Sequence, residues 1–89
     1  MNQDPVKKAR GIAYRLLARK ARTKKQMNDA LLRRKIPMET ASLVITELLE
    51  AGYIDDQKYT RDYILYRLNT KPYGPYWLRA SLLRQGIGR

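Results

Sequence analysis

Residues 23–36, TKKQMNDALLRRKI, contain the signals that decide the fold of this 89-residue chain. Thr23 is followed by Gln26 three residues later, the capping box in which each side chain bonds the other residue's backbone N–H at a helix start. Apolar residues then recur at helical spacing, at Met27, Ala30 and Leu31. Ile36 precedes a proline, which disfavours a helical residue before it. The stretch therefore predicts a short amphipathic helix that ends near Lys35.

The same stretch recurs later in the chain. When the sequence is shifted by 51 positions, residues 74–87, GPYWLRASLLRQGI, match residues 23–36 without a gap, and both contain Leu-Leu-Arg. Upstream residues also correspond at this shift: Ile12 and Ala13 with Tyr63 and Ile64, and Leu17 with Leu68. Two amphipathic helices can resemble each other by chance, but an ungapped match with matching end signals argues against chance. An internal repeat of this kind indicates one helical unit used twice.

Helix signals also precede and follow the first stretch. Asp4 and Pro5 are a favourable N-cap and first helical residue. They predict a helix to about Ala21, with apolar residues Ala9, Ile12, Ala13, Leu16 and Leu17. A further helix is expected from about Met38 to Ala51, with Ala41, Val44, Ile45 and Leu48 facing inward. The first stretch thus becomes the middle helix of a three-helix unit.

The segment LEAGYIDDQKY, residues 49–59, joins the two repeats. Gly52 is typical of the left-handed residue that follows a helix. Asp55 is placed to N-cap a fourth helix, and Asp56 would follow at its first position, where a negative charge complements the helix dipole. A two-carboxylate Mg²⁺ site would need further ligands, which the neighbouring sequence does not supply. We therefore expect the two aspartates to be structural.

The second half of the chain predicts a fourth and a fifth helix. The fourth carries tyrosines on one side, Tyr59, Tyr63 and Tyr66, and Ile64 and Leu68 on another. A turn is expected at residues 71–75, KPYGP, and Pro75 begins a helix that Gly86 ends, with Leu78, Ser81 and Leu82 inward. The predicted fold is all-α, with tandem three-helix units. Residues 1–51 form the first repeat, 52–55 the corner between repeats, and 56–89 the first two helices of a second, truncated repeat.

The composition argues against an enzyme. The chain has no His and no Cys, which removes the usual general base near neutral pH and the thiolate nucleophile or metal ligand. No apolar run approaches the roughly 20 residues of a membrane span, and the N-terminal MNQDPVKKAR lacks the apolar core of a signal peptide. We expect a cytoplasmic protein without catalytic residues, metal or cofactor.

The charge is distributed in blocks. Residues 1–35 carry 12 Lys and Arg against two acids, residues 36–56 carry five acids and no Lys or Arg, and residues 57–89 carry seven Lys and Arg against one acid. The net charge is +11. Such a basic surface is typical of proteins that bind a polyanion or an acidic protein, although a solvated surface is the simpler explanation.

Two sets of residues are candidates for contact with a partner. The first is basic: Arg15, Arg19, Arg22, Lys24, Lys25, Arg33, Arg34 and Lys35. Its first three members follow helical spacing and are expected to share one face of the first helix. The second set is aromatic (Tyr59, Tyr63, Tyr66, Tyr73, Tyr76 and Trp77), which suits either packing between helices or stacking on single-stranded bases. Within it we favour Tyr66 with Arg67 as an exposed pair.

The ordered motifs resemble a known family. GYIDDQKYTRDYILYRL (52–68) followed by KPYGPYWLRASLLRQGI (71–87) is similar to the RecX regulatory proteins, with their Gly-Tyr-Ile-Asp-Asp corner, aromatic-rich helix and Gly-Pro helix start. Upstream, LLARKARTKKQMNDALLRRKIP (16–37) fits the basic first repeat of that family. Two departures exist: Lys35 stands where the family often has a helix-ending Gly, and the family usually carries more repeats than this chain holds. The resemblance implies a short member or a fragment.

What the resemblance implies is regulation. RecX-like proteins bind the RecA recombinase filament on single-stranded DNA, lie in its helical groove and block its growth, ATPase, strand exchange and coprotease activities. The family has no known catalytic residues, metals or cofactors. Expected partners are therefore the RecA filament, with single-stranded DNA as a further candidate for the basic surface, and neither a membrane nor a small-molecule substrate. The implied processes are DNA repair, DNA recombination and the SOS response.

One alternative belongs to another class of protein. Residues 23–55 also fit two helices of a winged helix-turn-helix-like DNA-binding module, in which residues 38–51 would read the major groove. This helix has no Lys or Arg and carries three acids, Glu39, Glu47 and Glu50, which suits DNA poorly. Helix signals, not strand signals, follow Asp55. An enzyme that uses the two aspartates is a more distant alternative.

Overall fold

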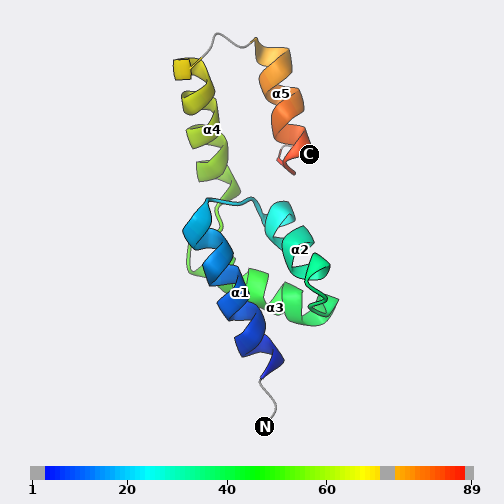
Figure 1. The fold of residues 1–89 in the computed structure, drawn as a ribbon. Helices are drawn as coiled ribbons and strands as arrows, with labels where there is room; N and C mark the ends of the chain where they lie inside the picture. Colours follow the sequence, from blue (N-terminus) through cyan, green and yellow to red (C-terminus); the bar gives the residue numbers. More distant parts are fainter. Residues whose placement is uncertain (1–3, 71–73, 88–89) are drawn as a thin grey trace.

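The structure, a computed structural model, describes residues 4–70 and 74–87, and these contain five helices and no strand. In chain order the helices are α1 (Pro5–Arg19), α2 (Lys24–Arg33), α3 (Met38–Glu50), α4 (Asp56–Thr70) and α5 (Pro75–Arg84) (Figure 1). The all-α fold class is confirmed. Residues 71–73, which include Tyr73 and most of the predicted turn, lie outside the described residues, as do residues 1–3 and 88–89.

The predicted helix starts are confirmed by their hydrogen bonds. The Asp4 carboxylate accepts a bond from the Val6 N–H at 3.0 Å, and Pro5 occupies the first turn of α1. At the start of α2 both bonds of the capping box form, each 3.1 Å long, between Thr23 and Gln26. These bonds satisfy backbone donors that have no partner inside the helix. Local sequence alone therefore fixes where α1 and α2 begin.

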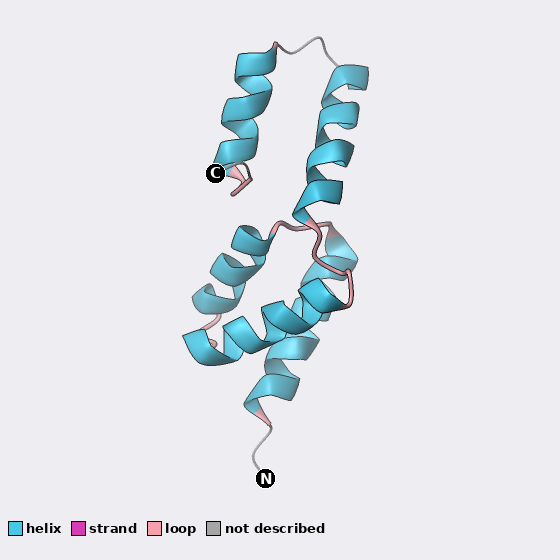
Figure 2. Cartoon of the chain, turned by 180° about the vertical axis from the view of Figure 1, so that it is seen from behind, coloured by secondary structure: helices cyan, strands magenta, loops and turns pink. Residues whose placement is uncertain are grey.

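Helices α1, α2 and α3 enclose one hydrophobic core, with α3 lying across the other two (Figure 2). The core residues are Ala9, Ala13, Leu16, Met27, Ala30, Leu31, Ile36, Ala41, Val44, Ile45, Leu48 and Ile54. The predicted inward faces of α2 and α3 are confirmed, whereas Ile12 and Leu17 of α1 are only partly buried. Met27, Leu31 and Leu48 are at most 1% exposed, and burial stabilises each by about 1.5–3 kcal/mol.

Helix α1 ends at Arg19, two residues before the predicted end at Ala21. Lys20 is extended, with φ −168° and ψ 158°, and its N–H still reaches the Leu16 carbonyl at 3.3 Å. The chain must leave the helix here because Thr23 has to reach the start of α2. The prediction that Arg22 shares a helix face with Arg15 and Arg19 is therefore wrong.

The helices of the second half match those of the first half at the 51-residue shift. Added to the bounds of α1 and α2, this shift gives the bounds of α4 and α5. The ends of α2 and α5 also bond alike: the Ile36 N–H donates to the Leu31 carbonyl at 3.1 Å, and the Ile87 N–H to the Leu82 carbonyl at 2.9 Å. The division of the chain into repeats at residues 1–51, 52–55 and 56–89 stays a prediction.

Both of these helix ends need a left-handed residue. Lys35 has φ 63° and Gly86, its counterpart at the shift, has φ 94°. A Cβ atom makes this conformation unfavourable by roughly 1–2 kcal/mol, which is why glycine is usual there. Both residues are left-handed, but this conformation is strained only at Lys35, which has a Cβ atom, and not at Gly86.

Helices α4 and α5 form a hairpin that extends the molecule to 54 × 20 × 20 Å (Figure 1). Polar tips of aromatic side chains hold the hairpin together. The Tyr59 hydroxyl donates to the Gln85 side-chain oxygen, and Tyr63 shares a hydrogen bond with Ser81. The two tyrosine rings stack with centroids 6.3 Å apart. Tyr59 and Tyr63 therefore serve the packing of the hairpin, as the packing hypothesis for the aromatic set predicts.

The hairpin is joined to the core where three helix ends meet. The Thr23 hydroxyl donates to the Gln85 backbone carbonyl at 2.7 Å, which connects the start of α2 to the end of α5. The Asp56 carboxylate, at the first residue of α4, accepts a bond from the Lys24 N–H at 2.9 Å. We refer to these contacts of Thr23, Lys24, Asp56 and Gln85 as the helix junction.

Lys35→Gly is expected to raise the free energy of unfolding by about 1 kcal/mol, because the relief of the left-handed strain outweighs the extra entropy that glycine has in the unfolded chain. Urea unfolding followed by circular dichroism measures the change. Lys35→Ala removes the same charge and keeps the Cβ, so it should give no such gain. An equal gain in both variants would contradict the backbone explanation.

Gly86→Ala is expected to loosen the helix junction. A Cβ at Gly86 would lie 2.6 Å from the Lys25 Cβ, closer than such atoms approach, and φ 94° strains it further. Amide hydrogen exchange should then show lost protection in α5 and little change in α1 to α3. Gly74→Ala is the matched control, because a Cβ there meets nothing within 4 Å. Unchanged protection of α5 in Gly86→Ala would refute the tight fit.

Candidate functional site

The residues predicted to contact a partner lie on different parts of the molecule. Arg15 and Arg19 are on α1, and Arg22 lies between α1 and α2. Helix α2 begins with Lys24 and Lys25 and is capped at its end by Arg34, whose exposed neighbours are Arg33 and Lys35. Tyr66 and Arg67 are on α4. One sequence-defined set therefore divides into separate surfaces, each with its own chemistry.

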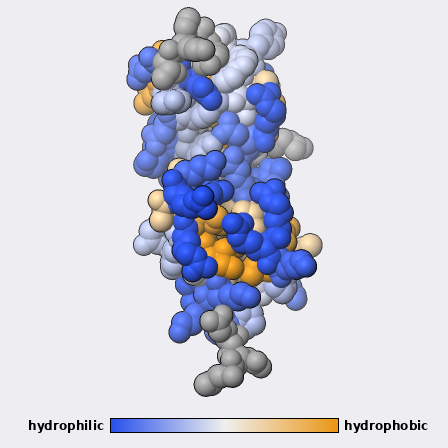
Figure 3. Space-filling model, in the orientation of Figure 1, coloured by the Kyte–Doolittle hydropathy of each residue, from blue (hydrophilic) through white to orange (hydrophobic). Residues whose placement is uncertain are grey.

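Three arginines surround one hollow between α1 and α2. Ile12 and Leu16 line it together with Arg15, Arg19 and Arg34, and it encloses about 350 Å³. We call this the arginine hollow. Figure 3 shows apolar surface over α1 and α2 that is bordered by hydrophilic side chains. Arg34 is held in place because its guanidinium donates to the Ala30 carbonyl at 3.3 Å.

The arginine hollow has the chemistry of a site for an anionic partner. Arg15 and Arg19 are exposed and have no carboxylate partner within residues 4–70 and 74–87. A guanidinium offers a planar fork of donors that matches a carboxylate or a phosphate. The apolar floor would take an apolar side chain or the face of a base. The sequence placed Arg15 and Arg19 together, but the approach of Arg34 from α2 depends on the fold.

Arg22 has a structural role instead. It is half-buried, and its Nε donates to the Leu16 carbonyl at 3.4 Å. The Leu16 carbonyl, which also accepts the Lys20 N–H, thus receives a second donor at the end of α1. Arg22 therefore stabilises the exit from α1 and does not extend the exposed basic row.

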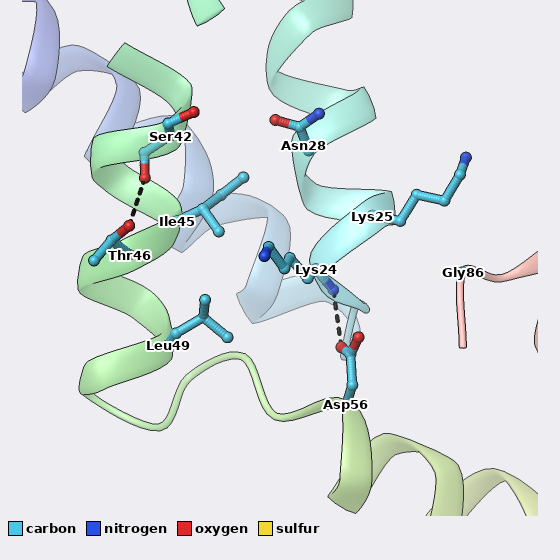
Figure 4. Close-up of a pocket in the computed structure, with 9 residues that line it drawn as sticks. All are labelled: Lys24, Lys25, Asn28, Ser42, Ile45, Thr46, Leu49, Asp56 and Gly86. Carbon is cyan, nitrogen blue, oxygen red and sulfur yellow. Dashed lines mark hydrogen bonds between the residues drawn. The ribbon is translucent and has the colours of Figure 1, made fainter. Parts of the chain in front are cut away.

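Lys24 and Lys25 line a pocket of about 430 Å³ at the helix junction, beside Asn28, Ser42, Thr46 and Asp56 (Figure 4). In this view the Lys24 side chain is directed toward α3 and the Lys25 side chain away from it. Lys25 forms an exposed ion pair with Asp29 at 3.0 Å. The backbone N–H of Lys24, bonded to Asp56, is used by the fold. The Lys25 ammonium is thus engaged by Asp29, whereas the exposed Lys24 side chain forms no ion pair with a described carboxylate.

The expectation that Tyr66 and Arg67 form an exposed pair is correct only for the tyrosine. Tyr66 is 60% exposed, whereas Arg67 is half-buried. The Arg67 guanidinium lies over the rings of Tyr63, Tyr66 and Trp77, at 5.2, 5.5 and 5.3 Å from their centroids. Cation–π contacts of this kind fix the side chain between α4 and α5. Sequence spacing could not reveal this because Trp77 comes from the other helix.

The two aspartates of the corner both bind helix ends. The Asp55 carboxylate accepts the Lys58 N–H at 3.1 Å, which confirms it as the N-cap of α4. Asp56 begins α4 as predicted, and it also caps α2 through Lys24, which the sequence did not indicate. Within the described part of the chain, no group of three or more His, Cys, Asp or Glu side chains could hold a metal ion.

An ion pair between α1 and α3 was not predicted. Arg10 donates from Nε to one Glu47 oxygen at 2.9 Å and from Nη2 to the other at 3.1 Å. These hydrogen bonds hold the pKa of the Glu47 carboxyl below its usual value and raise the pKa of Arg10. The sequence contained a signal for this ion pair: Arg10 follows the buried Ala9 and Glu47 precedes the buried Leu48, so both charged residues border the faces that pack together.

The alternative in which α3 reads a DNA groove is disfavoured by the surface that this helix exposes, which includes Glu39 and Glu50 and no Lys or Arg. Its Ala41, Val44, Ile45 and Leu48 are buried against α1 and α2. No strand follows within residues 52–70 or 74–87, so the described chain offers no wing. As for membranes, none of the described helices is both long enough and apolar enough to span a bilayer.

Comparison with known proteins agrees with this geometry. Residues 9–48 match the family model for the first three-helix domain of RecX. The chain is 35% identical to the regulatory protein RecX of Streptomyces lividans over 96% of its own length and 45% of the relative. It is 31% identical to that of Leuconostoc citreum over 94% of this chain and 32% of the relative.

A solved structure is similar over nearly the whole chain. The crystal structure of RecX from Lactobacillus salivarius superposes with a TM-score of 0.92 at 28% identity, covering 96% of this chain and 55% of that one. The fold and the matched domain define an all-helical protein built on a three-helix domain. The chain belongs to the RecX family.

The chain spans about a third to a half of the curated relatives' length. This agrees with the expectation of a short member or a fragment. The relatives are named regulatory proteins, a class distinct from enzymes.

The Arg10–Glu47 pair predicts a pH dependence of stability. The pKa of Glu47 is lower in the folded protein than in the unfolded chain, where it is about 4.3. The ionised Glu47 therefore stabilises the fold at a pH above the unfolded pKa, and this contribution is lost as the pH falls through the folded pKa. The melting temperature of the wild type should therefore fall more steeply below about pH 5 than that of Glu47→Gln. Glu50→Gln, at an exposed carboxylate on the same helix, should behave as the wild type does. Parallel curves for the wild type and Glu47→Gln would contradict this contribution.

Proposed function

We propose that this chain binds the RecA filament on single-stranded DNA and inhibits its growth, ATPase, strand exchange and coprotease activities. The observation that carries the proposal is membership of the RecX family, together with a fold that matches a RecX crystal structure across 96% of the chain. On this proposal the protein acts in the cytoplasm, in DNA repair, DNA recombination and the SOS response. RecA, and single-stranded DNA within its filament, are the proposed partners.

The arginine hollow is the proposed contact surface. It combines three guanidinium groups with an apolar floor, and its partner can be an acidic segment of RecA or the phosphates of the DNA that RecA holds. Its three arginines belong to a chain whose net charge is +11. Charge of this density accelerates encounter with a polyanion and makes binding sensitive to salt.

The elongated shape supports inhibition by bridging. At 54 Å in its longest dimension, the molecule can reach across neighbouring subunits of a filament. The hydrogen bonds of the helix junction link the three-helix core to the α4–α5 hairpin. A ligand fixed across two subunits hinders subunit addition and the motions that accompany ATP hydrolysis.

The proposal is tested by titrating the chain into RecA-dependent ATP hydrolysis on single-stranded DNA, with duplex and single-strand binding measured in parallel. Inhibition that rises with concentration and weakens with salt is expected. Absence of inhibition together with tight, sequence-specific duplex binding would overturn the proposal in favour of a helix-turn-helix-like DNA-binding module.

Reversing the charge of the hollow should weaken inhibition. The triple variant Arg15→Glu, Arg19→Glu, Arg34→Glu is expected to raise the concentration for half-inhibition about tenfold or more, equivalent to at least ~1.4 kcal/mol of binding. The variant Lys7→Glu, Lys8→Glu, Lys20→Glu changes the net charge equally at exposed positions outside the hollow. Equal losses in both variants would assign the effect to net charge and refute the hollow as the contact surface.

A further inference from the structure

Two aromatic rings and a guanidinium form an exposed cluster on α4 and α5. The Arg67 guanidinium lies 5.5 Å from the centroid of the Tyr66 ring and 5.3 Å from that of the Trp77 ring. Tyr66 is 60% exposed and Trp77 is 37% exposed. We call Tyr66, Arg67 and Trp77 the ring cluster. Because cation–π contacts hold its members together, the cluster presents ring surface to solvent in a fixed arrangement and beside a positive charge.

The other described tyrosines of α4 have a different role. Tyr59 and Tyr63 are half-buried, and each hydroxyl is hydrogen-bonded to a side chain of α5 or of its C-cap. Packing of the hairpin therefore accounts for Tyr59 and Tyr63, whereas most of the Tyr66 surface faces solvent.

The ring cluster lies on the same side of the molecule as the arginine hollow. Figures 1 and 2 show α4 continuing the line of α1 and α5 continuing the line of α2. At the 51-residue shift, Arg15 and Leu16 of the hollow correspond to Tyr66 and Arg67. We call the side that carries the arginine hollow and the ring cluster the front face.

Helix α3 packs on the opposite side of α1 and α2, as the view from behind shows (Figure 2). A helix placed on α4 and α5 as α3 is placed on α1 and α2 would therefore leave the ring cluster uncovered. The front face is a continuous surface of both helix pairs.

The charges of the hairpin suit a polyanion. Residues 57–89 carry seven Lys and Arg and a single acid, Asp62. The Asp62 carboxylate is paired with the Lys58 ammonium at 2.7 Å. A chain of phosphates that passes from the arginine hollow to the ring cluster thus meets cations and rings, and the one carboxylate of this segment is already neutralised.

This combination of groups matches a single strand of nucleic acid. Guanidinium groups bind phosphates, and every base has a π-face that can stack on an aromatic ring, whatever the sequence. In a duplex the bases are stacked on one another, so exposed rings cannot reach their faces. An acidic peptide would use the guanidinium groups but supplies no regular series of flat rings. The ring cluster therefore favours a single strand over a duplex or an acidic peptide.

We propose that Tyr66 and Trp77 stack on unpaired bases of a single strand whose phosphates are bound in the arginine hollow. The identity of the strand rests on the proposed function, in which RecA holds single-stranded DNA, and the ring cluster adds a second subsite with different chemistry. The hollow attracts the strand through charge. The ring cluster distinguishes a single strand from a duplex.

The test measures binding of an oligothymidine of about 12 nucleotides, within the roughly 4–16 nucleotides that such surfaces span. Trp77 is the only tryptophan of the chain, so a base stacked on it should quench the emission of the protein. An abasic strand of the same length has the same charge and should bind about tenfold more weakly, because it cannot stack. A duplex can occupy the arginines, but it should leave the Trp77 emission nearly unchanged.

Substitution of Tyr66 tests the stacked contact directly. Tyr66→Ala should weaken oligothymidine binding about tenfold, whereas Tyr66→Phe keeps the ring and should bind as the wild type does. Tyr53→Ala is the matched control, because Tyr53 is also 60% exposed but lies at the corner between repeats, against Tyr14. It should change the affinity less than Tyr66→Ala by a wide margin.

The salt dependence of binding separates the two subsites. Each phosphate that a cation binds on a single strand contributes about 0.7 to the slope of log affinity against log salt. The triple variant Arg15→Gln, Arg19→Gln, Arg34→Gln should therefore reduce this slope by about 2. Tyr66→Ala should lower the affinity and leave the slope unchanged. Circular dichroism checks that each variant keeps its helices.

RecA-dependent ATP hydrolysis is measured with the same proteins, so the two proposals can fail separately. Inhibition by a chain that does not bind oligothymidine would overturn the stacking subsite and leave the proposed function standing; strand binding without inhibition would do the reverse. Equal affinity for the abasic strand, or unchanged affinity in Tyr66→Ala, would also overturn the subsite. Displacement of the oligothymidine by polyglutamate of equal charge, at the same affinity, would assign the front face to an acidic protein segment.

Discussion

The arrangement of this protein depends on the buried hydroxyl of Thr23. The residue is 0% exposed, and its hydroxyl accepts the Gln26 N–H at 3.1 Å while donating to the Gln85 carbonyl at 2.7 Å. A buried polar group left without partners costs about 1–3 kcal/mol, so both bonds must form together. One side chain thereby starts α2 and fixes the end of α5 against it. Together with the Lys24–Asp56 hydrogen bond, this contact links the core to the hairpin.

The helix dipoles reinforce the same arrangement. The positive N-terminal ends of α2 and α4 meet around the Asp56 carboxylate, and the negative C-terminal end of α5 faces the start of α2. The two acids of the corner therefore act through geometry. Three of the five acids in the acidic block of the sequence have structural roles: Glu47 serves the core through Arg10, and Asp55 and Asp56 cap helices.

Sequence reasoning succeeded where the signal is local. The capping box of Thr23 and Gln26, the N-cap at Asp55 and the apolar spacing of α3 depend on neighbours within one or two helical turns, so they could be predicted. It failed where the fold overrides the local pattern. The early end of α1 follows from the path to the buried Thr23, and Arg67 is held by a ring on another helix. Arg34 joins Arg15 and Arg19 only because α1 and α2 pack together.

The coincidence of helix bounds at one fixed shift has a consequence for how the molecule can recognise a partner. Units that repeat along a chain place equivalent backbone positions at a regular spacing, although their side chains differ here: Arg15, Arg19 and Arg34 correspond to Tyr66, Thr70 and Gln85 at this shift. A filament of identical subunits also has a regular spacing, and where the two periods agree, several weak contacts form together and their effects multiply. Selectivity can then reside in the match of periods. On the proposed function, a single isolated subunit, or a filament of different pitch, would satisfy only one contact at a time and would be bound weakly.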